Sequence, residues 1–189
     1  EKMQVEYEAL LSQINPHFLF NALDCLRGMA LKYKARDLSL SIRSLSLMLQ
    51  YSLVDTHTSV TLKDEMENLQ NYLEVVKNQS DNRLECQFDV QPDTYDDPVI
   101  KFMLQPIVEN SIYHGFNKMT QSCAIKINIS RKGDRILYEV IDNGKGMSRE
   151  KIRQALKEER SENSHSFNKI GLYNVNKRIQ YTFGGAYGV

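Results

Sequence analysis

The chain lacks an excess of charge of either sign. Among its 189 residues, 24 are Lys or Arg and 24 are Asp or Glu, so the formal net charge is zero. Proteins that bind mainly nucleic acid normally carry a basic excess, because they must neutralise phosphates. We therefore expect no nucleic-acid partner. The 41% of apolar and 25% of charged residues indicate a soluble globular protein with enough core to fold independently.

Long apolar segments are missing too. No uninterrupted apolar run approaches the ~18 residues that a membrane-spanning helix requires, and no signal peptide is visible. The sequence opens at Glu1 in a stretch of helical character. We interpret it as a fragment of a longer protein, whose upstream segments can still be membrane-bound.

Cysteine is scarce, and the spacing of the three cysteines suggests no pair. Cys25, Cys86 and Cys123 are widely spaced and odd in number, and no C-x-x-C pair occurs. This pattern disfavours a metal site, so we expect buried reduced thiols in a reducing compartment.

Glycine is almost absent from residues 1–80, where only Gly28 occurs. Asp37 is predicted to cap the second of three helices, and Thr61 with Asp64 forms a capping box for the third. We expect antiparallel helices whose wide apolar faces need a partner, most simply a second copy of the chain. Apolar residues recur at helical spacing in three runs, at about 11–29, 38–53 and 62–76.

After residue 80 the apolar period changes from helical to alternating. The turn R-K-G-D at 131–134 is predicted to join two strands as a hairpin. Segments 91–98 and 147–169 are predicted to be a turn-rich loop and a mobile loop. Residues 81–189 are therefore expected to form an α+β sandwich, with helices on one face of a mixed sheet. The expected strands are 84–90, 123–130 and 135–142, and the expected helices are 99–117 and 170–183.

The stretch P-H-F-L-F-N at 16–21 combines two unfavourable features. A proline inside a helix costs ~3 kcal/mol, and a histidine follows it among aromatic and aliphatic neighbours. At helical spacing His17 lies on the same side of the helix as Asn21 and Asp24, at the edge of its polar face. His17 is then either a surface histidine beside a kinked core helix, or a nucleophile that accepts a phosphoryl group on its imidazole.

The stretch L-Q-P-I-V-E-N-S-I-Y-H-G-F at 104–116 carries a polar cluster. Gln105 and Pro106 suit a helix start, and Gly115 suits its end. The amide oxygen of Asn110 is a hard donor suited to Mg²⁺, although such a cluster can also be a merely solvated face. Four side chains are predicted to lie close together around this helix: Glu109, Asn110, Tyr113 and His114.

The stretch V-I-D-N-G-K-G-M at 140–147 follows an apolar strand. A buried Asp142 carboxylate there can accept the exocyclic amine of adenine, and Gly144 and Gly146 let the backbone approach a ligand. Gly171 precedes a further helix, whose N–H groups can receive phosphate oxygens. The alternative is a tight turn without a ligand.

Together these stretches resemble the LytS/YesM-type sensor histidine kinases over nearly the whole chain. P-H-F-L-F-N resembles their H-box, L-Q-P-I-V-E-N their N-box, D-N-G-x-G-M their G1 box and I-G-L-x-N-V-x-x-R their G2 region. The resemblance implies a helical dimerization and phosphotransfer region, 1–80, and a Bergerat-type ATP-binding domain, 81–189. It also implies ATP and Mg²⁺ as cofactors, a homodimer, a response-regulator receiver domain as partner, and an upstream membrane sensor segment. The chain would be the cytoplasmic portion of a bacterial plasma-membrane protein.

By this resemblance His17 is the phosphoacceptor and Asn110 the Mg²⁺ ligand. Asp142 binds adenine, and residues 147–169 form the ATP lid. Pro16 and the apolar neighbours of His17 would loosen the helix and fix its presentation. The residues implied to contact the nucleotide are Asn110, Tyr113, His114, Asp142, Gly144, Gly146, Met147, Gly171 and Leu172.

The sequence departs from the family pattern in several places. Phe18 stands where many histidine kinases have an acid, and Asp24 is ~10 Å further along the helix. The general base is therefore absent or comes from the ATP-binding domain, with Glu109 as the candidate. Asn21 matches the site that positions a phosphatase water, and Tyr113 replaces a frequent lysine.

Two further departures concern the end of the chain. Lys169 stands where the first glycine of the lid is common. The sequence stops at Y-G-V before the usual closing strand, which we interpret as truncation within the sheet.

Three functions compete. The first is an ATP- and Mg²⁺-dependent protein histidine kinase that phosphorylates His17 and then a response-regulator aspartate. The second, an ATP-hydrolysing clamp, is disfavoured because Pro106 occupies the place of the glutamate that activates water. The third is a catalytically silent dimeric scaffold that binds nucleotide, favoured by Phe18, Tyr113 and the missing strand.

Overall fold

The computed structural model describes residues 16–53, 60–80, 83–116, 122–157 and 171–189. They belong to two compact units, which divide between Asp55 and Thr56. The division therefore comes before the third predicted helix, which we had expected to belong with the first two.

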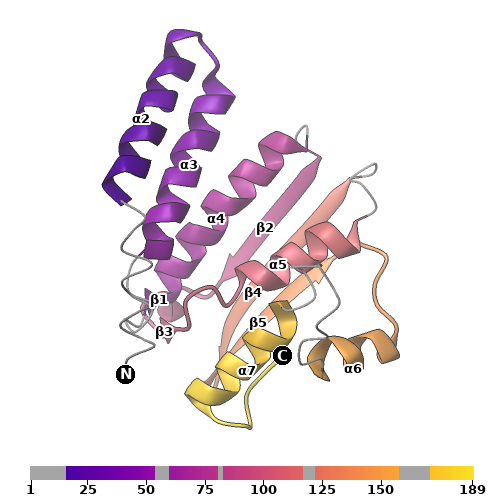
Figure 1. Cartoon of the computed structure of the whole chain (residues 1–189). Coiled ribbons are helices and arrows are strands. Elements are labelled where there is room, and N and C mark those ends of the chain that lie inside the picture. Colours follow the sequence, from indigo (N-terminus) through magenta and orange to yellow (C-terminus); the bar gives the residue numbers. More distant parts are fainter. Residues whose placement is uncertain (1–15, 54–59, 81–82, 117–121, 158–170) are drawn as a thin grey trace, which may run out of the picture. The chain divides into compact units, whose positions relative to one another are not determined.

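The described part of the first unit, residues 16–53, contains two helices, α2 (Pro16–Lys32) and α3 (Arg36–Leu53), which pack side by side as an antiparallel hairpin (Figure 1). The hairpin interface is small, since Ala30, Ser39 and Ser44 are the buried residues of these helices. The prediction that Asp37 caps α3 is wrong. The helix already begins at Arg36, and Asp37 lies in its first turn, where its negative charge still suits the positive end of the helix dipole.

The apolar faces of these two helices remain largely exposed. Phe18 is 67% exposed, and about half of the surface of Leu26 and Met29 is accessible. Cys25 is exposed as well, which corrects the expectation that all three thiols are buried. Cys86 is half-buried and Cys123 is buried in the second unit, and burial raises the pKa of the Cys86 thiol to about 11.

The second unit is built on a three-stranded mixed sheet, as predicted. β2 (Leu84–Val90) pairs in parallel with β4 (Cys123–Lys132), which pairs antiparallel with β5 (Arg135–Asp142). The predicted hairpin joins β4 and β5, and Gly133 adopts the left-handed φ of +64° that its turn requires. A small second sheet pairs β1 (Val60–Thr61) with β3 (Pro98–Val99).

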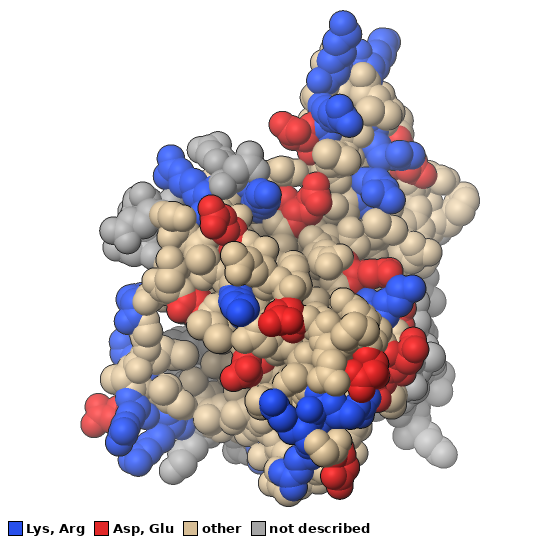
Figure 2. Space-filling view, turned by 180° about the vertical axis from the view of Figure 1, so that it is seen from behind, with Lys and Arg blue, Asp and Glu red and all other residues tan. Residues whose placement is uncertain are grey.

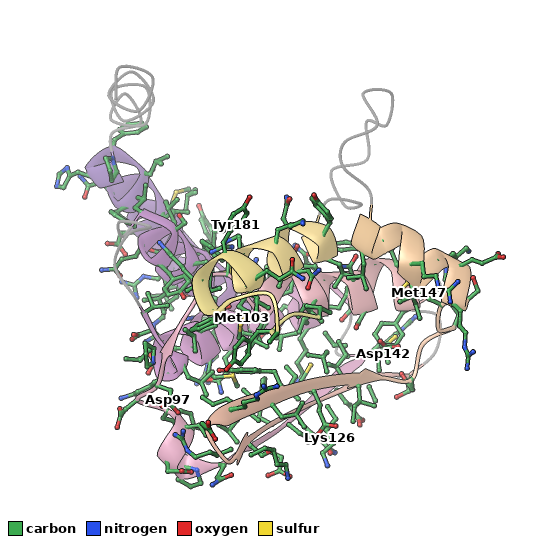
Figure 3. All side chains as sticks on the ribbon, turned by 90° about the horizontal axis from the view of Figure 1, so that it is seen from below. Asp97, Met103, Lys126, Asp142, Met147 and Tyr181 are labelled. Atoms are coloured by element: carbon green, nitrogen blue, oxygen red, sulfur yellow. The ribbon has the colours of Figure 1, made fainter. Side chains whose placement is uncertain are left out.

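Helices cover one face of the mixed sheet (Figures 1 and 3). These are α4 (Leu62–Gln79), α5 (Gln105–Asn110) with its π-helical continuation η2 (Ser111–Gly115), and α7 (Gly171–Phe183). Lys126 of β4 points to the opposite face, away from the helices (Figure 3). Alternation along β4 sends Ile125, Ile127 and Ile129 inward, where each is almost completely buried.

The capping box of α4 is confirmed. The Thr61 hydroxyl accepts from the Asp64 N–H at 3.2 Å, and the Asp64 carboxylate accepts from the Thr61 N–H at 2.9 Å. This arrangement satisfies two N–H groups that the first helical turn would otherwise leave unpaired.

Two predicted boundaries are wrong. The helix expected over 99–117 begins only at Gln105, because the chain turns at Phe102 with a left-handed φ of +54°. The loop expected over 147–169 contains a helix, α6 (Arg149–Lys157), and residues 158–170 lie outside the described residues. The turn-rich loop expected over 91–98 is confirmed: a short 3-10 helix, η1 (Pro92–Thr94), is followed by turns that lead into β3.

Acidic and basic side chains are mixed over the surface seen from behind (Figure 2). This distribution agrees with the absence of a net charge. Within the described ranges, no helix is both long and apolar enough to cross a membrane.

Candidate functional site

His17 lies in the first described turn of α2 and is exposed. The side-chain amide of Asn21, one turn later, is 3.2 Å from His17 Nδ1. The contacting atom of Asn21 is the amide nitrogen, Nδ2, so in this arrangement the amide N–H donates and Nδ1 accepts with its lone pair. Asn21 therefore contacts the histidine itself, a role beside the water-positioning one implied by its sequence.

Pro16 is the first described residue of α2. The predicted cost of a proline inside a helix depends on the residues that precede Pro16. Residues 1–15 lie outside the described residues. Phe18 is mostly exposed, and Leu19 and Phe20 are half-buried, so these neighbours leave the imidazole of His17 accessible.

Asn110 ends α5 and is half-buried. Its Nδ2 donates to the Pro106 carbonyl oxygen at 2.8 Å, which turns Oδ1 away from that carbonyl. A Cβ at Gly171 would lie 3.5 Å from Asn110 Nδ2, so the first turn of α7 packs against this side chain. The free end of the amide is thus an oxygen, the donor type that Mg²⁺ requires.

Asp142 ends β5 with both carboxylate oxygens hydrogen-bonded. Ser111 Oγ donates to Oδ2 and the Gly144 N–H donates to Oδ1, each at 2.9 Å. Asp142 is exposed, which corrects the prediction of a buried carboxylate. The reason is its position, because it lies at the end of an outer strand of the described sheet.

Gly144 and Gly115 pack backbone against backbone beside this carboxylate. A Cβ at Gly144 would lie 2.7 Å from the Gly115 carbonyl oxygen and 2.8 Å from Asp142 Oδ1. The Lys145 N–H donates to the same Gly115 carbonyl at 2.9 Å. Only glycine fits at 144, and the resulting close turn keeps side-chain atoms out of the space next to Asp142.

The structure brings together most of the residues predicted to contact a nucleotide. Asn110, Asp142, Gly144 and Gly171 gather around α5 and η2 in the second unit. Around them, Tyr113 and Met147 are more than half exposed, His114 is exposed and Leu172 is half-buried. Gly146 has a left-handed φ of +66°. His17 and Asn21 belong to the first unit.

Sequence reasoning missed two residues of this site. Ser111 binds Asp142, although the two are 31 residues apart in sequence. Gln105 Nε2 donates to Glu109 Oε1 at 2.9 Å, a bond that the four-residue helical spacing would have suggested.

A cavity of about 410 Å³ lies beside α7. It is lined by Phe102, Pro106, Gly171 and Tyr181, among others, and its surface is mainly apolar. Asn110 and Asp142 do not line it, but Gly171, which packs against Asn110, belongs to the cavity wall as well as to the polar cluster.

Comparison with known proteins finds two family matches. Residues 5–84 match the family "Histidine kinase", and residues 95–189 match "Histidine kinase-, DNA gyrase B-, and HSP90-like ATPase". The boundary between these matches lies later in the chain than the division between the compact units at 55/56.

Similar curated proteins are named as sensor kinases. The chain is 30% identical to "Sensor histidine kinase YesM" of Bacillus subtilis over 186 residues, which are 98% of this chain and 30% of that protein. It is 32% identical to "Sensor protein LytS" of Oceanobacillus iheyensis over 171 residues, 90% of this chain and 29% of that protein. The chain thus spans about 30% of the length of these relatives.

Among solved structures, the histidine kinase domain from the Erythrobacter litoralis EL346 blue-light activated histidine kinase is similar. The match has a TM-score of 0.45 and 14% identity, and it covers 86% of this chain and 83% of that chain.

Proposed function

Because the chain belongs to the sensor histidine kinases, within the histidine kinase-, DNA gyrase B- and HSP90-like ATPase family, we propose that it transfers the γ-phosphoryl group of ATP to His17. The phosphoryl group then passes to an aspartate of a response-regulator receiver domain. Residues 1–80 would supply dimerization and phosphotransfer, and residues 81–189 ATP binding.

The observation that carries this proposal is the arrangement of Asp142 and Asn110 around one helix. Ser111, next to Asn110, donates to Asp142 at 2.9 Å, so the carboxylate suited to an adenine amine lies beside the helical segment that carries the amide suited to a metal. The missing Cβ at Gly144 lets the Gly115 backbone and the Asp142 carboxylate approach the turn closely, so that the Gly144 N–H orients this carboxylate. These features support an adenine nucleotide with its phosphates toward Asn110 and Gly171.

The donor set fits Mg²⁺, because the Oδ1 of Asn110 is turned away from the Pro106 carbonyl that holds its Nδ2. When bound with ATP, the metal ion supplies charge neutralisation on the phosphates. Asn110 would hold it, together with water and phosphate oxygens.

The imidazole of His17 is exposed. This suits a phosphoryl acceptor that must reach bound ATP first and the response-regulator receiver domain afterwards. In the proposed step its nitrogen lone pair forms a bond to the γ-phosphorus, the bond from that phosphorus to the bridging oxygen breaks, and ADP leaves. The ring N–H proton passes to a base. Phe18 cannot accept it, so we assign this role to Glu109 of the ATP-binding part.

A silent scaffold remains the second candidate because of Tyr113. This side chain is 59% exposed and uncharged where the family often has a lysine. It therefore offers the phosphates a hydroxyl in place of a cation. The hydrolytic clamp is not supported, since Pro106 cannot activate water.

We further propose that the functional protein is a homodimer, that an upstream segment anchors it to the bacterial plasma membrane, and that the region described above faces the cytoplasm. The name of LytS as a sensor protein and of YesM as a sensor histidine kinase supports this setting. Nucleic acid is not a proposed partner.

The test is covalent labelling of the full-length protein with γ-labelled ATP and Mg²⁺. We expect label that is lost in acid and retained in base, because the P–N bond of phosphohistidine is acid-labile. His17→Gln should take up no label yet bind ATP normally, since His17 lies in the unit that lacks Asp142 and Asn110. His57→Gln, at a histidine that lies outside the H-box and the nucleotide motifs, serves as the labelled control. Label retained in His17→Gln contradicts the acceptor assignment, whereas normal ATP binding without any label supports the scaffold.

A further inference from the structure

One face of α4 presents three buried polar side chains to the segment that leads into α5. Glu65 is 0% exposed, Asn68 2% and Tyr72 8%. Their spacing of three and four residues places them above one another on the helix. Buried polar groups are costly unless they form hydrogen bonds, so each of these three requires a reason for its position.

Glu65 holds the start of α5. Its carboxylate accepts from the Phe102 N–H at 2.9 Å and from the Leu104 N–H at 3.0 Å. Because these bonds cross from one helix to the segment before another, they fix the N-terminal end of α5 against α4.

Asn68, one turn further along α4, begins a chain of amide hydrogen bonds. Its Nδ2 donates to Gln105 Oε1 at 3.0 Å, and Gln105 Nε2 donates to Glu109 Oε1 at 2.9 Å. The bond from Asn68 occupies the oxygen of the Gln105 amide, which leaves the N–H₂ end to face the carboxylate. The orientation of one amide thus determines the orientation of the next group.

One unpaired atom argues that this chain is more than a stabilising contact. Asn68 Oδ1 is buried without a hydrogen-bond partner among the described residues. A leucine at position 68 would fill similar volume without an unpaired buried oxygen. The unpaired Asn68 oxygen costs stability, and it occurs where the nitrogen of the same side-chain amide orients Gln105.

Tyr72 provides an uncharged neighbour for Glu109. Burial raises the pKa of the Tyr72 hydroxyl far above its ordinary value, and the charge of Glu109 raises it further. The phenol therefore stays protonated and adds no second negative charge beside the Glu109 carboxylate.

From this geometry we propose that Asn68 and Gln105 are positioning residues that hold the Glu109 carboxylate in one orientation for its proposed role as the base. This inference rests on the proposed function, because it concerns the base of that reaction. A glutamate side chain on a helix surface samples several rotamers, and a bond from a fixed amide to an ionised oxygen selects one of them. Neither Asn68 nor Gln105 needs to touch ATP or His17.

The first arm of the test measures the single-turnover rate of phosphohistidine formation in the full-length protein at saturating ATP. Gln105→Met, similar in shape but unable to donate, should slow it about tenfold with unchanged ATP affinity, since a bond to a charged group is lost. Asn68→Leu should slow phosphohistidine formation about threefold, because Gln105 can still donate to Glu109 but loses the hydrogen bond from Asn68 that orients its amide. Asn71→Leu is the matched control: Asn71 Nδ2 donates to the Glu67 carbonyl of its own helix at 2.9 Å, and its loss should leave the rate unchanged.

The second arm separates positioning from general damage to the fold. In a Glu109→Gln background, Gln105→Met should slow the remaining reaction less than twofold, because the group on which Gln105 acts is already neutral. An equal loss in both backgrounds would overturn the inference, as would a wild-type rate in Gln105→Met. Absence of label in the wild type would instead overturn the proposed function.

A readout without catalysis completes the design. The side-chain N–H₂ signals of Gln105 in the ¹⁵N-labelled protein should shift in both Asn68→Leu and Glu109→Gln and stay in place in Asn71→Leu. Signals that do not respond to Glu109→Gln would overturn the proposed hydrogen-bond chain, whether or not the protein takes up label.

Discussion

Asp142 accepts a hydrogen bond on each carboxylate oxygen, from Ser111 and from the Gly144 N–H. These donors orient the carboxylate without removing it from solvent, since each oxygen has a second lone pair for a ligand. An exposed but oriented acceptor can bind the exocyclic amine of adenine and discriminate against guanine, which presents an oxygen at that position.

We expect Asp142→Asn to weaken ATP binding by about 1–3 kcal/mol, because a charge-assisted hydrogen bond is lost. Titration calorimetry with ATP and GTP measures the effect. Asp134→Asn, the same change at an exposed residue of the β4–β5 turn, should leave the affinity unaltered. Equal ATP affinity of the wild type and Asp142→Asn would exclude Asp142 from the adenine site.

Asn110 is the second residue whose orientation makes a specific prediction. We expect Asn110→Ala to abolish the Mg²⁺-dependent increase in nucleotide affinity while the fold persists, since the half-buried side chain donates to the Pro106 carbonyl of its own helix. The measurement is the ratio of ATP affinities with Mg²⁺ and with a chelator. A wild-type ratio in this variant would rule out Asn110 as the ligand.

At the scale of elements, the start of α4 depends on the pair Thr61 and Asp64. The Thr61 hydroxyl accepts from the Asp64 N–H, and the hydrogen bonds from Thr61 to the Asp64 carboxylate hold the pKa of that carboxyl below its ordinary value of 3.8. A lowered folded-state pKa contributes stability above the ordinary value, and this contribution is lost as the pH falls through the lowered one.

Thr61→Ala should therefore reduce the free energy of unfolding by about 1 kcal/mol at neutral pH. The difference from the wild type should shrink as the pH is lowered through and below 3.8, because protonated Asp64 no longer attracts the Thr61 donors. Urea unfolding at several pH values measures this, with Thr182→Ala on the exposed side of α7 as control. A pH-independent difference would mean that the side-chain bond to the carboxylate contributes nothing.

At the scale of the whole molecule, the first unit leaves much apolar surface uncovered. Two helices alone bury little, and exposed leucines and aromatics are stable in water only when another surface covers them. A second copy of the chain is the covering surface that we propose. The side chains concerned include Phe18, Leu26, Met29, Leu38 and Leu45.

We expect a dimer in solution and a monomer after Leu26→Glu, because a carboxylate at the centre of an apolar interface would lose its hydration. Light scattering at micromolar concentration measures the mass. Lys32→Glu, on the same helix but at an already polar exposed position, should remain dimeric. A wild-type monomer with full helicity would contradict the dimer.

Features that depend on near neighbours follow from the order of the residues alone. Alternating residues predict β2, β4 and β5 because period-two side chains face opposite sides of a sheet. Thr61 and Asp64 predict the start of α4, since a capping box involves residues only three apart. The motifs around His17, Asn110 and Asp142 likewise stand out because the required residue types lie within a few positions of one another.

Only the tertiary structure decided how distant segments meet. The exposure of Cys25 and Asp142, the place of α4 in the second unit, and the bonds from Ser111 to Asp142 and from Asn68 to Gln105 all join or separate residues far apart in the chain. The helical or alternating spacing of apolar residues indicates which face of an element is apolar, but it does not indicate which other element covers that face. That choice depends on the packing and register of whole elements, so the hydrogen bonds that orient Asp142 and Glu109 become visible only in the folded chain.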